Sequence, residues 1–241
     1  MDNWVCGVHA VFEALSSGRQ SIERIHVARE IRSAKLNEIL ERARERGVPV
    51  RKDDRAVLDR LAHGAVHQGI LAIVGEFGYA PFEKLFEPER PCVVVLDGVE
   101  DPHNLGAVIR TAEACGVSGV IVPERHCAPL NATVAKASAG ALAHQPVVRV
   151  PNLVSALDKL KEKGLWIVGL DAAAGRLWTD FDYTVPIALV LGGEHRGLRR
   201  LVREHCDAVV RLPMQGRVAA LNVSVASGIV LYEVIRQRSK P

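Results

Sequence analysis

Short apolar runs alternate with amphipathic stretches along most of the chain. In the C-terminal part, such runs are typical of strands that are buried on both faces of a sheet. They cover residues 92–96, 119–122, 166–170, 187–191 and 208–211. The stretches between them repeat apolar residues at helical spacing, over residues 105–115, 132–143, 153–163, 198–204 and 218–236. This alternation predicts repeated strand–helix units and therefore a parallel sheet.

A smaller α/β unit is predicted before residue 77. Its expected helices and strands cover residues 8–15, 34–46 and 55–61, and residues 22–27, 48–50 and 70–74, respectively. From residue 77 to residue 91 the periodicity lapses and prolines stand among glutamates, which is typical of a stiff, solvated linker. We therefore expect an α/β protein with two domains, residues 1–76 and 92–241, joined by a linker over residues 77–91.

The composition narrows the class of protein. Of the 241 residues 48% are apolar, enough for packed cores, and the net charge of +3 permits an acidic partner such as RNA without requiring one. The five cysteines are widely spaced and show no zinc-binding pattern, so we expect a reducing, cytoplasmic setting and no metal. No export signal is recognisable, and no run approaches the ~18 apolar residues that span a membrane. These features predict a soluble protein.

Three glycine-bearing loops follow predicted strands and lead into helices. The first runs from Asp97 to Gly106, with Pro102 and Asn104 at a credible helix start and Arg110 six residues beyond Asn104. Gly106 and Arg110 are four residues apart, so both would face one side of the helix. Arginine suits a two-pronged grip on a phosphate. The alternative is that Asn104 only caps the helix and that Arg110 is only a surface cation.

The second loop covers residues 192–197 and follows a predicted buried strand. Parallel α/β sheets bind their ligands at this end of their strands. Glu194, in the middle of the loop, would repel a pyrophosphate, which argues against dinucleotide binding. Its carboxylate suits a cationic or hydroxyl-bearing ligand better. The alternative is a tight turn with a solvated Glu194.

The third loop leads from Leu212 into the last helix. It places Asn222 and Ser224 where a buried helix should begin, although a single capping residue would suffice. Leu212, Met214 and Leu221 could line an apolar slot. This makeup is typical of a ligand-binding loop, with a hydrogen-bonded core asparagine as the alternative.

Together the three loops resemble the motifs of the SpoU (TrmH) class of RNA ribose 2'-O-methyltransferases. The matching segments, in the order of the family, are Asn104-x-Gly106-x-x-x-Arg110, Gly192-x-Glu194-x-x-Gly197 and Leu221-Asn222-Val223-Ser224-Val225-Ala226. Residues 7–11 and 67–70 resemble the N-terminal domain of the bacterial 23S ribosomal RNA guanosine 2'-O-methyltransferases of the RlmB type. The resemblance extends from about Gly7 to Arg238.

This resemblance implies a fold, a cofactor and partners. Members of the superfamily, called SPOUT, have a parallel sheet whose C-terminal segment passes through a loop as a deep trefoil knot, an exception to the rule against threading. The N-terminal domain would be a ribosomal-protein-like α/β module that binds RNA, and the knotted domain would form a homodimer. S-adenosylmethionine would bind in the knot against Gly192, Leu212, Met214 and Leu221.

The activity implied is methylation of a ribose 2'-hydroxyl, by resemblance that of a guanosine in 23S ribosomal RNA, without a metal. The implied catalytic residues are Arg110, Asn104, Glu194, Asn222 and Ser224. In the family the residue matching Arg110 is assigned as the general base. A guanidinium, however, resists deprotonation, so a clamp on the neighbouring phosphate is the alternative role.

Two other functions fit part of the sequence. The three loop motifs alone would also suit methylation of a transfer RNA ribose, although the N-terminal module argues against it. A non-catalytic RNA-binding relative is the second alternative, and loss of Arg110 or Asn222 would be its mark, but both are present. A nucleotide-dependent metabolic enzyme would need a phosphate loop at Rossmann spacing, which we do not find.

Overall fold

The computed structural model describes residues 3–17, 21–31, 33–75, 77–193 and 197–239. The chain divides into two compact units. The first unit comprises Met1–Gly78 and Leu130–His144, and the second comprises Tyr79–Pro129 and Gln145–Pro241. Within the described ranges no helix is long and apolar enough to cross a membrane.

The first unit is built on a mixed sheet of four strands, in the order β1-β4-β2-β3. Its elements are β1 (Asn3–Cys6), α1 (Val8–Ser17), β2 (Ile22–Ala28), α2 (Ala34–Glu45), β3 (Val50–Asp53), α3 (Arg55–Leu61), β4 (Ile70–Val74), α5 (Ala132–Ala137) and the 3-10 helix η2 (Ala141–Ala143). Strand β4 runs antiparallel to β1 and β2, whereas β2 and β3 are parallel. Ser33 starts α2 by accepting a hydrogen bond from the Leu36 amide at 3.1 Å.

Residues 130–144 belong to the first unit by their contacts, although their place in the sequence suggested the C-terminal domain. The predicted helix over residues 132–143 ends early, because Ala139 and Gly140 both adopt a positive φ that an α-helix cannot continue through. The chain then turns beside α1. There His144 Nε2 lies 2.7 Å from Glu13 Oε2, and a Cβ at Gly140 would lie 2.9 Å from Glu13 Cγ.

The second unit is built on seven strands in the order β7-β6-β5-β10-β8-β11-β9, and every pair is parallel. Its strands are β5 (Cys92–Asp97), β6 (Gly119–Pro123), β7 (Val147–Val150), β8 (Trp166–Leu170), β9 (Arg176–Leu177), β10 (Ile187–Gly192) and β11 (Ala208–Arg211). Its helices are α4 (Pro102–Ala114), α6 (Leu153–Glu162), α7 (Arg200–Glu204), α8 (Val223–Arg238) and the 3-10 helices η1 (Phe82–Phe86) and η3 (Trp178–Asp180). The predicted α/β class and parallel sheet are confirmed, and the trefoil knot stays a prediction.

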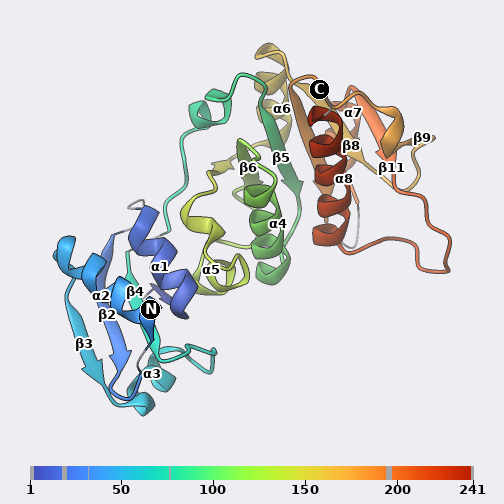
Figure 1. Cartoon of the computed structure of the whole chain (residues 1–241). Helices are drawn as coiled ribbons and strands as arrows, with labels where there is room; N and C mark the ends of the chain where they lie inside the picture. Colours follow the sequence, from blue (N-terminus) through green and yellow to red (C-terminus); the bar gives the residue numbers. More distant parts are fainter. Residues whose placement is uncertain (1–2, 18–20, 32, 76, 194–196, 240–241) are drawn as a thin grey trace. The chain divides into compact units, whose positions relative to one another are not determined.

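Both faces of this sheet are covered, as the apolar runs predicted. On one face, alternate residues of the strands pack against α6, α7 and η1. On the other, α4 and α8 lie side by side (Figure 1). The predicted linker is only partly solvated, because Leu85 in η1 is fully buried in this core, where a Cβ at Gly119 would overlap it.

The last helix holds the amino ends of the central strands together. From its final turn, the Arg238 guanidinium donates to the carbonyl oxygens of Tyr183 and Arg90 at 2.9 Å each, and to that of Val185 at 2.8 Å. Burial of the guanidinium lowers the pKa of Arg238 from its usual value. One side chain thereby joins the segments that precede β5 and β10.

Replacing Arg238 should destabilise the second unit. We expect Arg238→Ala to lower the free energy of unfolding by about 1 to 3 kcal/mol, because it leaves several partly buried carbonyl oxygens without a donor. Urea denaturation followed by circular dichroism measures this change. The control is Arg200→Ala, which removes an exposed ion pair with Glu204. It should change the free energy of unfolding by less than about 0.5 kcal/mol. Equal effects of the two variants would contradict the structural role of Arg238.

Candidate functional site

The candidate site lies at the carboxyl ends of β5 and β10, which are neighbours in the middle of the sheet. From β5 the chain continues to strands on one side, β6 and β7, whereas β8, β11 and β9 lie on the other side of β10. Open parallel sheets bind ligands at such a switch in strand order. The ends of the two strands are joined, because the Gly193 amide donates to the Asp97 carbonyl oxygen at 2.8 Å.

A buried carboxylate holds the residue that precedes α7. The Asp97 side chain is fully buried and accepts hydrogen bonds from the Arg199 backbone amide, at 2.8 Å, and from Arg199 Nε. The guanidinium of Arg199 remains half exposed at the edge of the site. Our sequence analysis did not assign a role to this pair. The only local signal was an acidic residue at the end of a buried strand, and its partner lies about a hundred residues further on.

An apolar cavity of about 340 Å³ opens beside the end of β10. All four residues predicted to bind the cofactor, Gly192, Leu212, Met214 and Leu221, line it. Its remaining lining includes Leu170, Asp171 and Leu191 from the neighbouring strands and Val223 and Ala226 from α8. Residues of the second and third predicted loops line this cavity together, and no residue of the first loop does.

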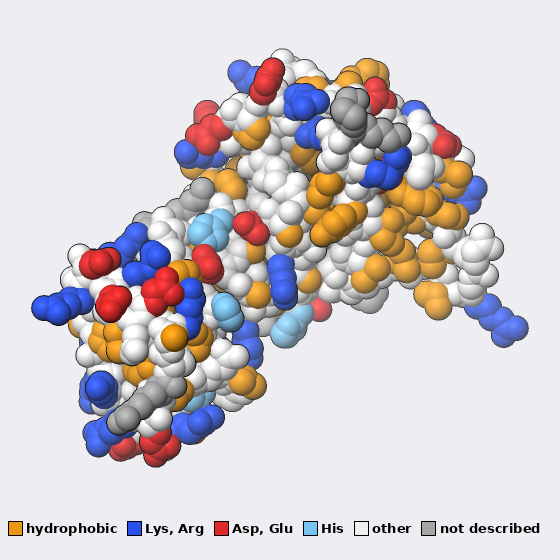
Figure 2. Space-filling model, in the orientation of Figure 1, with side chains coloured by type: hydrophobic (Ala, Val, Ile, Leu, Met, Phe, Trp, Pro, Cys, Tyr) orange, Lys and Arg blue, Asp and Glu red, His pale blue; other side chains and the backbone are white. Residues whose placement is uncertain are grey.

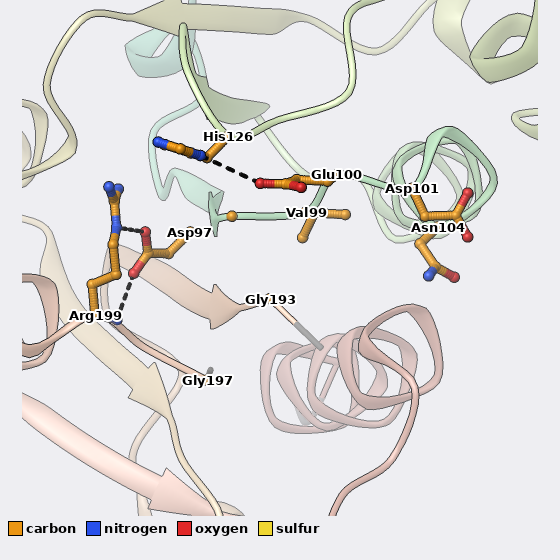
Figure 3. Close-up of a pocket in the computed structure, with 10 residues that line it drawn as sticks. Asp97, Val99, Glu100, Asp101, Asn104, His126, Gly193, Gly197 and Arg199 are labelled. Atoms are coloured by element: carbon orange, nitrogen blue, oxygen red, sulfur yellow. Dashed lines mark hydrogen bonds and ion pairs between the residues drawn. The ribbon is translucent and has the colours of Figure 1, made fainter. Parts of the chain in front are cut away.

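A more polar cavity of about 570 Å³ adjoins it, and the two share Gly193 and Gly197 in their walls. Figure 3 shows Asp97 and Arg199 on one side of it, Glu100 and His126 on a second side and Asn104 on the adjacent helix. The carboxylate of Glu100 lies 3.4 Å from His126 Nδ1, and both side chains are largely exposed. Glu100 and His126 are further residues that our sequence analysis did not single out.

Asn104 is not the cap of α4. Asp101 has that role, since it accepts a hydrogen bond from the His103 amide at 2.8 Å, and Pro102 occupies the first turn. Asn104 is instead buried within the helix, where its Oδ1 accepts a hydrogen bond from Asn222 Nδ2 at 2.9 Å. The reading of Asn104 as a simple helix cap is therefore wrong.

Asn222 and Ser224 form one hydrogen-bonded group at the start of α8. The Asn222 Oδ1 accepts from the Ser224 amide at 2.8 Å and from its hydroxyl at 2.6 Å. Asn222 thus caps α8 with its oxygen while its amide nitrogen reaches α4. The first and third predicted loops meet at this contact, between the polar and the apolar cavity.

One predicted catalytic residue, Arg110, stands apart from this group. Arg110 is exposed on α4 and lines neither cavity, and its side chain has no ion pair or hydrogen bond within the described residues. Glu194 lies outside the described residues. Across the part of the chain that is described, no three His, Cys, Asp or Glu side chains gather as a metal site would require.

Glycines are required where the two cavities meet. A Cβ on Gly192 would overlap the carbonyl group of Gly197, and a Cβ on Gly193 would overlap the carbonyl oxygen of Gly98. Backbone groups therefore approach each other more closely here than any side chain would permit.

Comparison with known proteins identifies the class. The sequence model of the SpoU rRNA Methylase family matches residues 91–232, and that of the RNA 2'-O ribose methyltransferase substrate-binding domain matches residues 4–80. A protein of Staphylococcus haemolyticus, assigned to the TrmH family of tRNA/rRNA methyltransferases, is 43% identical over 97% of this chain and 95% of its own length.

Solved structures agree with these matches. The SpoU methyltransferase AviRb from Streptomyces viridochromogenes, in complex with AdoMet, is similar with a TM-score of 0.85 and 28% identity over 98% of this chain and 89% of that one. An AdoMet-bound rRNA methyltransferase from Sinorhizobium meliloti has a TM-score of 0.85 and 25% identity over 99% of this chain and 88% of that one. The fold and the matches define an RNA methyltransferase that uses S-adenosylmethionine. The chain belongs to the SpoU (TrmH) family.

Adding one methyl group at Gly192 should distort the apolar cavity, which the sequence predicts to bind the cofactor. We expect Gly192→Ala to weaken S-adenosylmethionine binding by about tenfold or more, because the new Cβ displaces the backbone of Gly197. Isothermal titration calorimetry measures the affinity, and a thermal melt shows whether the variant remains folded.

The matched control is Gly175→Ala, since a Cβ there meets no atom within 4 Å and the backbone is not left-handed. It should bind the cofactor as the wild type does. A folded Gly192→Ala variant with unchanged affinity would contradict the assignment of this cavity to the cofactor.

Proposed function

We propose that the chain methylates the 2'-hydroxyl of a guanosine ribose in 23S ribosomal RNA, with S-adenosylmethionine as methyl donor. The observation that carries the proposal is the pair of adjoining cavities, one apolar and one polar, with Gly193 and Gly197 in both walls. A methyl transfer needs a donor and an acceptor held side by side and aligned with the methyl group between them. Such positioning can be worth ~7 to 11 kcal/mol of the barrier.

The apolar cavity fits the cofactor. Its volume lies at the lower end of the range usual for small-molecule sites. Leu170, Leu191 and Met214 offer apolar contact for a purine ring, and the backbone at Gly192 and Leu221 offers hydrogen-bonding groups. When bound, S-adenosylmethionine supplies a methyl group activated by its sulfonium.

The polar cavity and its edge would position the ribose. Asn104 lines this cavity, and its orientation is set by the hydrogen bond from Asn222. Asn222 is in turn held by Ser224, so three of the proposed catalytic residues form one preorganised group. The guanidinium of Arg199, held by Asp97, adds a cation at the opposite side of the cavity.

Arg110 would act on the RNA backbone beside the reacting hydroxyl. Its exposure and the absence of a described ion-pair partner leave all of its N–H donors available. A bidentate grip on the neighbouring phosphate, with polarisation of the hydroxyl, needs no deprotonated guanidinium. We therefore favour the phosphate clamp over the general base, and we keep Glu194 as a proposed residue that orders the pocket.

Ribosomal RNA is the preferred substrate. The first unit matches a model for RNA substrate binding, and both AdoMet-bound neighbours cover almost the whole chain, one of them described as an rRNA methyltransferase. A transfer RNA ribose is the second candidate, because the relative from Staphylococcus haemolyticus belongs to a family that acts on either RNA. The choice of guanosine rests on the resemblance of the motifs. A ribosomal RNA substrate implies a cytoplasmic enzyme that acts in rRNA processing.

Substitution of Arg110 should abolish transfer and spare cofactor binding. We expect Arg110→Ala to lower the turnover rate by about 10²- to 10⁴-fold, as loss of a positioned catalytic group does. If Arg110 is a clamp, Arg110→Lys should fail almost as badly, because lysine lacks the fork geometry. The measurement is transfer from labelled S-adenosylmethionine to undermodified 23S ribosomal RNA, with the product mapped by primer extension.

Transfer RNA serves as the competing substrate in the same assay. Methylation of transfer RNA alone would overturn the ribosomal assignment and keep the activity. Cofactor binding without transfer to either RNA would instead favour a non-catalytic RNA-binding relative.

We also propose that the second unit forms a homodimer through α8. One side of this helix packs inside the unit, but Val225, Ile229 and Tyr232 form an apolar stripe at helical spacing that is 38–60% exposed. Figure 2 shows hydrophobic side chains exposed over α8 and the loop that precedes it. A second copy would cover the stripe. It would also offer a neighbouring site for Arg110, which lines neither cavity of its own chain.

A charge within the stripe should separate the subunits. We expect Ile229→Asp to weaken dimerisation by at least tenfold, because a carboxylate would be buried without a partner. Sedimentation equilibrium measures the dissociation constant. The control is Leu201→Asp, at a similarly exposed apolar residue on α7, which should leave the dimer intact. A wild-type protein that is monomeric at micromolar concentration would contradict the proposal.

A further inference from the structure

One face of the first unit's sheet is only partly covered. Helices α1, α2 and α5 pack against the opposite face, in the cluster that contains Ile25, Val27 and Ile39. On this second face, α3 and the turn after it cover Cys6 and Leu71. Trp4 and Ile73 pack against the edge of this small cluster and remain partly exposed.

The strand register places one aromatic and two basic side chains on this face. Trp4 of β1 pairs with Ile73 of β4, and Ile73 pairs with Arg24 of β2. In the next row, Leu71 pairs with His26, and His26 with Arg51 of β3. Residues opposite each other in neighbouring strands share a face, so both rows lie on the same surface. We call Trp4, Ile73, Arg24 and Arg51 the open sheet face.

Exposure shows that this surface is accessible within the first unit. Trp4 and Ile73 are only partly buried, and Arg24 is exposed. The side chain of Arg51 is 63% exposed. Across the described part of the chain, Arg24 forms no ion pair, so its charge is not neutralised.

Arg51 is held in place by two buried polar residues. The side chains of Asp53 and His26 are each 7% exposed, and Asp53 Oδ2 accepts a hydrogen bond from His26 Nδ1 at 2.7 Å. The other oxygen of Asp53 lies 2.8 Å from Arg51 Nε. Burial would raise the pKa of Asp53, but the hydrogen bond from His26 and the charge of Arg51 outweigh it and lower the pKa below the usual value.

The function described so far does not use this buried pair. A buried carboxylate and imidazole are costly unless they satisfy each other, and here they also fix one edge of an exposed guanidinium. A guanidinium that is fixed at one edge presents its flat face without further loss of side-chain freedom. Such a plane, like the indole ring of Trp4 on the same sheet face, is a surface on which an unpaired nucleobase stacks.

We propose that the open sheet face binds unpaired nucleotides of the substrate RNA, with a base stacked on Trp4 and the backbone neutralised by Arg24 and Arg51. The proposal rests on the proposed function in that the RNA captured is the one to be methylated. The combination of an aromatic ring with exposed arginines favours single-stranded RNA, because a duplex offers phosphates but no free base faces.

Tryptophan fluorescence gives a direct test. The chain has three tryptophans, so the Trp166→Phe/Trp178→Phe variant leaves Trp4 as the only indole. The probes are an unpaired RNA of about 12 nucleotides, a length typical for one binding module, and a duplex of the same length. We expect the unpaired RNA to quench the Trp4 emission in a saturable manner. Saturable binding by anisotropy without any quenching would overturn the proposal.

Changes in the affinity for RNA distinguish base stacking on Trp4 from unspecific charge attraction. Trp4→Leu keeps apolar packing on the small cluster but removes the aromatic face, and should weaken binding of the unpaired RNA by about tenfold, whereas Trp4→Phe should retain most of it. Arg51→Ala should also weaken binding severalfold. The matched control is Arg60→Ala, an exposed arginine of α3 outside the open sheet face. An equal loss in Arg60→Ala would show unspecific charge attraction and overturn the proposal.

The same variants distinguish this proposal from the proposed function. S-adenosylmethionine affinity should be unchanged in Trp4→Leu, and its turnover at saturating RNA should match the wild type while the KM for RNA rises. Unchanged KM with normal turnover would refute the open sheet face and leave the methyltransferase assignment intact. Quenching by RNA in a protein without transfer activity would support the open sheet face and refute the methyltransferase assignment.

Discussion

A hydrogen bond between two amide side chains, Asn222 and Asn104, holds the candidate site together. Asn104 is buried in α4, where an amide without a partner would be costly, and Asn222 supplies that partner from the first turn of α8. Because the oxygen of Asn222 also caps α8, one side chain starts a helix and ties it to another that is more than a hundred residues away in the sequence. The packing of α4 against α8 and the walls of both cavities depend on this contact.

The site relies on backbone geometry more than on reactive side chains. Gly192 and Gly193 stand where a side chain would collide with neighbouring carbonyl groups, so strand ends and loops approach to within backbone contact. Asp97 then holds Arg199 at the start of α7. Such a scaffold is suited to a reaction in which the donor already carries an activated group and the protein mainly supplies alignment. In the function we propose, the apolar cavity would hold one substrate of that reaction and the polar cavity the other.

Local sequence patterns predicted five of the seven strands of the second unit, since these five are largely apolar runs. They missed β7 and the two-residue β9, which consists of Arg176 and Leu177. They misplaced the ends of elements, because caps decide those: α4 begins at Pro102 after Asp101, and α8 begins only at Val223. The three loops were recognisable by residue type, and Asn104 of the first meets Asn222 of the third. The pairing of Asp97 with Arg199 could not be predicted, because only the tertiary fold brings these distant residues together. The same holds for His26 and Asp53.

The first unit draws part of its core from the middle of the chain. Ala135 of α5 and Leu142 pack with the strands and helices formed by the first 78 residues, although β5, α4 and β6 are encoded between them. During synthesis on the ribosome, the core of the N-terminal sheet therefore remains incomplete until the first strands of the second unit have emerged. The two units are separate in their contacts but not in the order of their assembly, and a fragment that stops at the end of the N-terminal segment lacks residues that complete its own interior.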